Sequence, residues 1–257
     1  MKIHAEFKQK NGGDPTVEWM LARTGVVTAS EFDSLVSPKG KVRTGEGVET
    51  YLCKKLAETW LGGPLPAFTA FAVEQGVILE EQAVPFAELE YELEIRQVGF
   101  VSSNDGSIGC SPDGLIGFGQ LPLDTAKPTP ILDLPPNASG IEIKCPNLDT
   151  HIKYLLANCL PDDYVAQVQG SMYVTGCPTW HFLSYRRYMP PLHLIVERDE
   201  KYHAALEEAV DGFLERFEQA MATLIEINGG PPSPRHRGKV PFRKMLNEIG
   251  NDLNATA

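Results

Sequence analysis

Residues 140–145 read Gly-Ile-Glu-Ile-Lys-Cys, and this short stretch limits how the chain can fold. Side chains alternate between the two faces of a β-strand, so Glu142 and Lys144 share one face while Ile141 and Ile143 share the other. Two charges on a strand that buries isoleucines are costly unless something uses them. The pattern therefore predicts a buried strand that carries a functional site.

A second motif, Pro112-Asp113-Gly114, precedes this strand and lies at the end of a segment with β-type alternation, residues 106–116. A hairpin would bring the Asp113 carboxylate to that of Glu142, and two converged carboxylates either shift their pKa values or bind a cation. Magnesium prefers such oxygen ligands, and the Ile143 carbonyl could add one. Lys144 would then help to hold the attacking water and neutralise developing charge.

Each motif alone has a simpler explanation. Glu-x-Lys on a strand is usually a surface ion pair, and Pro-Asp-Gly is usually only a turn. In this order, on strands joined by a hairpin, the two motifs favour a nuclease site. From the residues alone, both interpretations stay open.

The composition is that of a globular protein, with 42% hydrophobic and 22% charged residues among 257. No apolar run could span a bilayer, and the first residues lack signal-peptide character, so we expect a cytoplasmic protein. The five scattered cysteines predict reduced, buried thiols. The net charge of −11 disfavours a uniformly DNA-binding surface, so nucleic-acid binding would need local basic residues.

Hydrophobic periodicity predicts helices at 47–61, 71–92, 162–175 and 199–227, and strands at 95–102, 106–116, 140–145, 179–185 and 192–197. We expect one α/β domain over residues 1–228. Residues 117–139, rich in Pro, Gly and Asp, form an insertion at the tip of the hairpin. A Gly/Pro linker and a basic, amphipathic tail follow at 229–257.

The chain resembles the phage lambda exonuclease and YqaJ-type viral recombinase family of the PD-(D/E)xK nuclease superfamily. The resemblance rests on six ordered segments, at 19–31, 76–80, 110–115, 142–146, 166–172 and 196–202. It implies a restriction-endonuclease-like core, with a central mixed β-sheet flanked by helices. It also implies a 5′→3′ exonuclease that digests double-stranded DNA to mononucleotides and leaves 3′ overhangs for recombination by strand annealing.

The resemblance further implies a homotrimeric ring around DNA, a single-strand annealing protein as partner, and two Mg²⁺ ions per site, with Mn²⁺ as a substitute. Lys144 would position the water, and Glu80 would support the metal site. The implied metal ligands are Asp113, Glu142, the Ile143 carbonyl and Asp105. The spacing of Asp105 from Asp113 differs by two residues from that in the family.

A pocket for the terminal 5′-phosphate is implied at Arg23, Ser30, Ser111 and Gln167. A guanidinium fork with hydroxyl and amide donors suits a phosphate, although without the resemblance Arg23 would be a structural ion pair and Gln167 a solvated helix residue. Lys39 and Arg43 could grip the incoming strand or simply be solvated surface. An endonuclease of the same superfamily and a non-catalytic DNA clamp or scaffold remain alternatives.

Overall fold

The computed structural model describes residues 1–4, 16–65, 72–119 and 127–231, and the side chains of 72–81 lie outside the description. The helices are α1 (Val17–Arg23), the 3₁₀ helix η1 (Ala29–Ser34), α2 (Glu46–Leu61), α3 (Ala72–Tyr91), α4 (Leu148–Ala157), α5 (Asp162–Thr175) and α6 (Glu200–Asn228). The strands are β1 (Lys2–His4), β2 (Val27–Thr28), β3 (Ile95–Arg96), β4 (Phe100–Ser102), β5 (Ile108–Cys110), β6 (Gly114–Ile116), β7 (Thr129–Pro130), β8 (Ser139–Lys144), β9 (Thr179–Ser184) and β10 (Leu192–Glu197).

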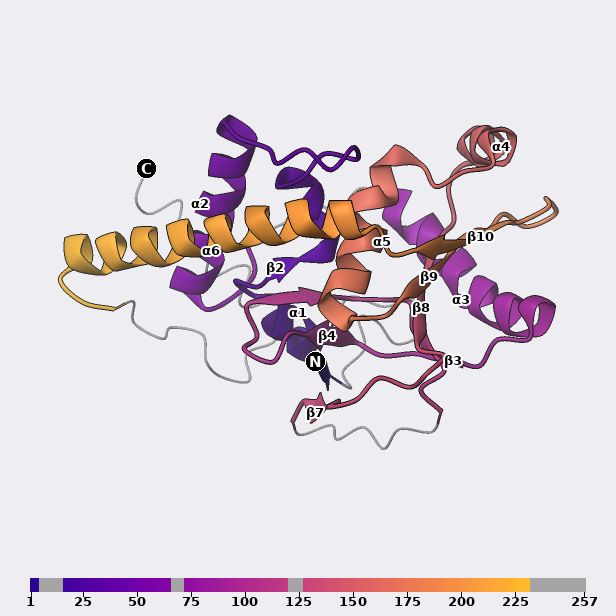
Figure 1. Ribbon diagram of the computed structural model, residues 1–257, viewed down its shortest axis with the longest axis horizontal. Helices are drawn as coiled ribbons and strands as arrows, with labels where there is room; N and C mark the ends of the chain where they lie inside the picture. The colour runs from indigo at the N-terminus through magenta and orange to yellow at the C-terminus, as the bar shows by residue number, and fades with distance from the viewer. Residues whose placement is uncertain (5–15, 66–71, 120–126, 232–257) are drawn as a thin grey trace.

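These strands form two five-stranded sheets, each with parallel and antiparallel neighbours. The first has the order β2-β5-β4-β1-β7, and the second has the order β10-β9-β8-β6-β3. Helices lie around both sheets (Figure 1). The expected mixed α/β fold is confirmed, with its strands divided between two sheets. The division lies at the Ser111–Asp113 connection: β5, before it, pairs with β4 in the first sheet, and β6, after it, pairs with β8 in the second.

Strand β8 lies in the middle of the second sheet, antiparallel to β6 and parallel to β9. Ile141 and Ile143 are fully buried in a small core with Ala83 and Ala87 of α3. This apolar face confirms the alternation predicted from the sequence. Glu142 and Lys144 therefore face the other way, toward α5.

Helix α5 crosses the centre of the molecule and touches η1 and strands of both sheets, including β5 and β9 (Figure 1). Gly170 makes the close approach to η1 possible, because a Cβ at this position would lie 2.3 Å from a ring carbon of Phe32. Packing between α5 and η1 thus fixes how the second sheet sits against the segment that follows α1.

Several parts of the chain differ from the sequence prediction. The stretches 95–102 and 106–116, each predicted as one strand, divide into β3 and β4 and into β5 and β6, and the two strands of each pair lie in different sheets. Strand β1, with three residues, is too short for a clear hydrophobic period, whereas helix α4 was overlooked although Leu148, Ile152 and Leu156 recur at helical spacing. The stretch 117–139 is not all loop: Thr129 and Pro130 form β7, which pairs with β1. The tail at 232–257 lies outside the described residues, so its predicted character stays a prediction.

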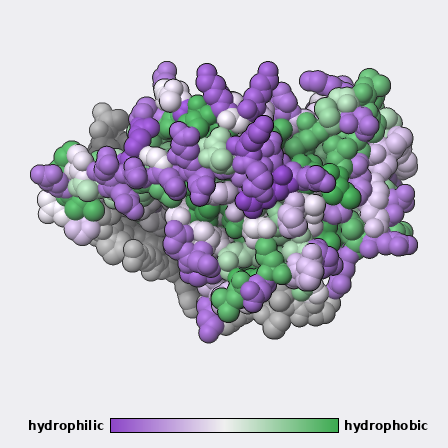
Figure 2. All heavy atoms as spheres, viewed as in Figure 1, coloured by the Kyte–Doolittle hydropathy of each residue, from purple (hydrophilic) through white to green (hydrophobic). Residues whose placement is uncertain are grey.

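The surface is polar over α6, whereas hydrophobic side chains gather over the corner where α4 and the β9–β10 hairpin lie (Figure 2). Leu148, Ile152 and Leu156 of α4 are exposed at this corner. None of the helices in the described ranges combines the length and apolar character that a membrane crossing needs.

A histidine pair on the β9–β10 hairpin should make the fold sensitive to acid. His181 Nδ1 lies 2.9 Å from His193 Nε2, and Tyr91 stacks on His193. Burial, followed by the neighbouring His193, lowers the pKa of His181 from 6.5 to about 4. Since the unfolded chain binds this proton more readily, stability is present above pH 6.5 and is lost as the pH falls toward 4.

We therefore predict that the free energy of unfolding falls between these two pH values, by up to about 1.4 kcal/mol for each unit of pKa shift. His181→Gln should flatten this dependence, because the substituted side chain does not titrate. Urea denaturation across the pH range measures it, and equal slopes for the parent and the variant would contradict the assignment.

Candidate active site

The turn into β6 brings Asp113 against β8. The main-chain N–H of Asp113 donates to the Ile141 carbonyl at 3.1 Å, and Asp113 Oδ2 accepts from the main-chain N–H of Ile143 at 2.6 Å. The carboxylate is thus fixed by the backbone of the strand that carries Glu142 and Lys144. Two strands joined by a hairpin place these three side chains together, as their spacing predicts.

Glu142 is held from two sides. Lys144 Nζ lies 2.6 Å from Glu142 Oε1, and Gln167 Nε2 of α5 donates to the same oxygen at 2.7 Å. Glu142 is only 3% exposed. The Lys144 ammonium also lies 5.1 Å from the centre of the Tyr164 ring. A buried carboxylate is tolerated when charge-assisted hydrogen bonds surround it.

The charges of this cluster act on one another. Burial lowers the pKa of Lys144, but the carboxylates of Glu142 and Asp113 outweigh this effect and raise the pKa above its usual value. The ammonium group therefore stays protonated at neutral and alkaline pH. One ammonium against two carboxylates leaves the cluster net negative, which favours a cation.

The donors suit magnesium, which takes oxygen ligands and keeps several waters. Asp113, Glu142 and the Ile143 carbonyl could hold it. Among the described side chains, no three from His, Cys, Asp and Glu form a group that could bind a metal ion. With only two carboxylates and one backbone oxygen as protein ligands, a magnesium ion would keep coordination positions for water or phosphate.

Two further residues predicted for the metal lie elsewhere or outside the description. Asp105 precedes β5, whereas Asp113 follows it, so the strand separates them. Its carboxylate accepts hydrogen bonds from Ser103 and Ser107 within the β4–β5 turn. These bonds lower the pKa of Asp105. The side chain of Glu80, on α3, lies outside the described residues.

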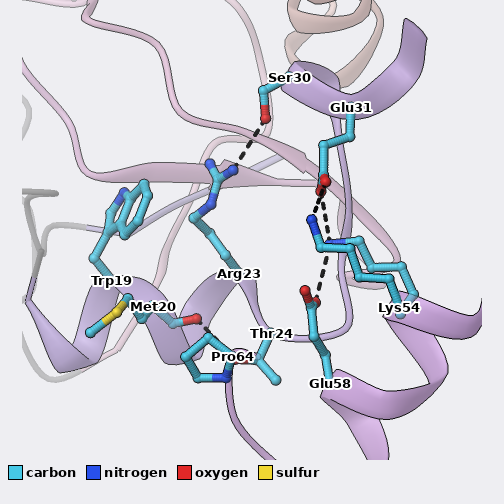
Figure 3. A pocket seen from close by; sticks show the side chains of 10 residues that line it. Trp19, Met20, Arg23, Thr24, Ser30, Glu31, Lys54, Glu58 and Pro64 are labelled. Carbon is cyan, nitrogen blue, oxygen red and sulfur yellow. Dashed lines mark hydrogen bonds and ion pairs between the residues drawn. The ribbon is translucent and has the colours of Figure 1, made fainter. Parts of the chain in front are cut away.

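Arg23, at the end of α1, lines a cavity of about 350 Å³ with Trp19 and Ser30 (Figure 3). Its guanidinium donates to Ser111 Oγ at 2.6 Å and to Ser30 Oγ at 3.2 Å, and it stacks 4.5 Å from the Trp19 ring. Burial lowers the pKa of Arg23, and Glu31 opposes this shift. Three of the four predicted phosphate ligands thus meet in one place.

Gln167, the fourth predicted phosphate ligand, is bonded to Glu142 instead and so bridges α5 to the acidic cluster. Gln169 has a structural role, because its amide bonds the Glu197 carbonyl and the Asp199 N–H between β10 and α6. Lys39 and Arg43 are exposed on the loop before α2, and Arg43 lines a separate cavity with Asp33 and Val48.

A group of four charges that also lines the Arg23 cavity was missed from the sequence. Lys55 of α2 is buried between Glu31 and Glu58, with its Nζ 3.1 Å from an oxygen of each. Lys54 also contacts Glu31. The two lysines outweigh the burial of Glu31 and lower its pKa. Only the i,i+3 spacing of Lys55 and Glu58 hints at this group in the sequence.

This network ties the two walls of the cavity to α2. Glu58 Oε2 accepts from the main-chain N–H of Gly25, just after Arg23, and Glu31 is the neighbour of Ser30. Gly25 adopts a positive φ of 73°, and a Cβ there would lie 2.3 Å from Thr59 Oγ1. The α2 ion pairs therefore set the separation between Arg23 and Ser30.

The cavity and the acidic cluster are neighbours through one chain segment. Ser111 contacts Arg23, and Asp113, two residues later, contacts β8. Two residues span at most about 7 Å. The main-chain positions that carry the two sites are therefore close together, and one nucleotide could bridge them.

Comparison with known proteins identifies the family. The model of the YqaJ-like viral recombinase domain matches residues 18–178. The chain belongs to this family. ExoD of Escherichia coli K12 is 42% identical over 69 residues, which cover 26% of this chain and 79% of ExoD.

Solved structures agree with this assignment. LHK-Exo, an alkaline exonuclease from Laribacter hongkongensis crystallised with dAMP, is 27% identical with a TM-score of 0.68 and covers 83% of this chain and 98% of its own. A phage-related exonuclease from Haemophilus somnus shares the fold, at 16% identity and a TM-score of 0.53 over 77% of this chain and 96% of its own. The predicted family and restriction-endonuclease-like fold are confirmed.

The buried position of Lys55 leads to a prediction about stability. Lys55 is 3% exposed and Lys54 43% exposed, although both contact Glu31. Lys55→Met should cost on the order of 3 kcal/mol, because Glu31 and Glu58 then lose a buried partner. Lys54→Met, the matched control, should cost less than about 1 kcal/mol. Urea denaturation measures both, and equal losses would contradict a bracing role for Lys55.

Proposed function

We propose that the protein is a magnesium-dependent 5′→3′ exonuclease that digests double-stranded DNA. It releases mononucleotides and leaves a 3′ single-stranded overhang for strand annealing. The observation that carries this proposal is the position of the Asp113–Glu142–Lys144 cluster two residues along the chain from the Arg23–Ser111 contact. A nuclease site lies beside a receptor for one phosphate.

Each residue has a role in hydrolysis. Magnesium held by Asp113, Glu142 and the Ile143 carbonyl would supply Lewis-acid stabilisation of the scissile phosphate. The protonated ammonium of Lys144 positions the attacking water and balances negative charge on the phosphate oxygens. Gln167 keeps Glu142 oriented through the bond to Oε1. Glu80, one helical turn before Ala83, is proposed to support the metal.

The Arg23 cavity supports attack from a chain end. A terminal 5′-phosphate carries more charge than an internal one and can enter the cavity that Arg23 and Ser30 line, where the guanidinium also contacts Ser111. With that phosphate bound, the next phosphate along the strand reaches the acidic cluster, so each cleavage releases one nucleotide. The mononucleotide dAMP bound by LHK-Exo is consistent with such a product.

The proposal extends to assembly. By resemblance to the family, we propose a homotrimeric ring that encloses DNA and acts with a single-strand annealing protein in the cytoplasm. Lys39 and Arg43, both exposed on one loop, are proposed to grip the incoming strand. A ring explains how a chain with a net charge of −11 retains DNA, because only the enclosed surface needs to be basic.

The first activity prediction concerns the cluster. Asp113→Asn and Lys144→Ala should each reduce hydrolysis of linear, 5′-phosphorylated duplex by at least about 100-fold, because each removes charge stabilisation at the scissile phosphate. A chelator of divalent ions should stop the parent enzyme, and added Mg²⁺ or Mn²⁺ should restore it. Retained activity in both variants would refute the proposal.

Substrate topology separates the alternatives. Covalently closed circular duplex should stay intact if ends are required, whereas an endonuclease would open it. A DNA clamp without catalysis would release no nucleotides from linear duplex under any metal condition. Acid-soluble nucleotides and gel mobility report these outcomes directly.

The second activity prediction concerns the cavity. Arg23→Ala should lower the rate on 5′-phosphorylated ends about tenfold or more and leave the rate on 5′-hydroxyl ends nearly unchanged, because only the former use the guanidinium. Leu21→Ala, on the exposed side of the same helix, is the matched control. If the parent shows no preference between the two ends, the cavity does not bind the terminal phosphate.

A further inference from the structure

The β9–β10 hairpin ends in a tip, residues 185–191, to which the proposed reaction gives no role. The tip begins where the catalytic strand ends: Lys144 and Ser184 are register partners, and the main-chain N–H of Tyr185 donates to the Lys144 carbonyl at 2.8 Å. Figure 1 shows the hairpin reaching outward next to α4. The tip is therefore a direct extension of the candidate active site.

The side chains at the tip combine cations with an aromatic ring. Tyr188 is 88% exposed, although tyrosine usually buries most of its ring. The Arg187 guanidinium lies 4.9 Å from the centre of this ring. Exposed aromatic rings next to arginines are typical of surfaces that bind nucleic-acid strands.

The backbone of Tyr188 is unusual for its residue type. The Met189 N–H donates to the Arg186 carbonyl at 3.1 Å and closes a four-residue turn with Tyr188 in the third position. Tyr188 has a φ of 67°, a conformation that favours Gly or Asn at this position. Neither packing nor turn geometry explains a tyrosine at this position. The explanation is therefore sought in a contact of its exposed ring with another molecule.

The tip is also braced. The His151 ring, on α4, lies 2.8 Å from Ser184 Oγ through Nδ1 and 2.9 Å from the Pro190 carbonyl through Nε2. Arg186 donates to the Pro146 carbonyl at 3.4 Å. These contacts hold both sides of the tip, so Arg187 and Tyr188 are presented from a fixed base.

The hairpin itself differs in charge from the chain as a whole, although exposed carboxylates of α3, such as Glu90, lie next to Tyr91, which stacks on His193. The chain has 34 acidic residues and a net charge of −11, yet no Asp or Glu occurs between residues 164 and 196. This stretch contains most of α5, the whole of β9, the tip, and β10 except for its last residue, Glu197. The only formal charges in it belong to Arg186 and Arg187, so the hairpin suits a polyanion.

In the view of Figure 1, the tip lies beyond the end of β8 on the side away from α1. Along the horizontal axis of Figure 1, α1 and β2 lie to the left, α5 and the end of β8 lie further right, and the hairpin tip lies furthest right. A strand with its 5′-phosphate at Arg23 and its scissile phosphate at Lys144 would continue toward the tip.

We propose that Arg187 and Tyr188 contact the backbone of the undigested duplex ahead of the scissile bond, and so help to retain DNA between successive cleavages. This inference rests on the proposed exonuclease function. Arg187 would bind a phosphate, and the Tyr188 ring would lie against the neighbouring sugar.

Binding of a fluorescently labelled, 5′-phosphorylated linear duplex tests the contact, with Lys144→Ala as the background so that the DNA stays intact. Tyr188→Gly should weaken binding about fivefold while the melting temperature stays the same or rises, because glycine accepts the positive φ. Tyr188→Trp should bind like the parent. Lost affinity without lost stability is a result that a purely structural role for Tyr188 cannot produce.

A charge series completes the test. Arg187→Gln should lower the slope of log affinity against log salt by about one. Arg216→Gln, which removes an exposed cation from α6, should leave that slope unchanged.

Equal affinities and slopes for the two tip variants and their background would overturn the inference, and would leave the exposed ring for a protein partner. The same slope change in Arg216→Gln would also overturn it, since net charge alone would then explain the effect. Failure of the protein with Lys144 intact to digest the duplex would instead refute the exonuclease function.

Discussion

The candidate active site depends on one alignment of β6 with β8. That alignment permits the hydrogen bond from the Ile143 N–H to the Asp113 carboxylate and places the other side chains of the site. Because side chains alternate, a slip of one residue would turn Glu142 and Lys144 into the small apolar core. Two glycines prevent that slip. A Cβ at Gly114 would lie 2.3 Å from Ile95, and one at Gly140 would lie 2.3 Å from Trp180. Close packing against these two glycines thus fixes the strand alignment on which the candidate active site depends.

Helix α5 converts this aligned pair of strands into a site with two parts. Its Gln167 and Tyr164 contact the charged face of β8. The helix also packs against η1, which contains Ser30. The phosphate cavity belongs to the first sheet and the acidic cluster to the second. Only the packing of α5 between them makes their spacing a fixed quantity, and a fixed spacing is what removal of one nucleotide at a time requires.

Much of this arrangement could be predicted from the sequence, for identifiable reasons. The alternation at 141–144 fixes the faces of β8, and Gly62 marks the end of α2 with a positive φ of 67°. The helix predicted at 162–175 has the observed bounds. Local patterns of this kind depend on few neighbours, so they survive folding unchanged.

What could not be predicted depends on contacts between distant segments. From the sequence, Lys55 looks like a solvated helix residue, but in the structure it is buried against Glu31, which lies 24 positions earlier. The contact of Gln167 with Glu142 was missed, because it depends on the approach of α5 to β8. Thr129 and Pro130 read as loop because their strand partner is the N-terminal β1, more than 120 residues away. Periodicity contains no information on such partners.

The acidic composition, which first argued against DNA as a substrate, is unevenly distributed. Helix α6 alone carries seven carboxylates against two cations, and its polar side chains cover the near face in Figure 2. That accounts for nearly half of the net charge of −11. Charge of this kind repels duplex from α6, whereas residues 164–196, which include the hairpin tip, contain no carboxylate. Repulsion from the acidic helix would then help to direct DNA toward the side that carries Arg187, Lys144 and Arg23. The net negative charge would in this way orient the approaching DNA.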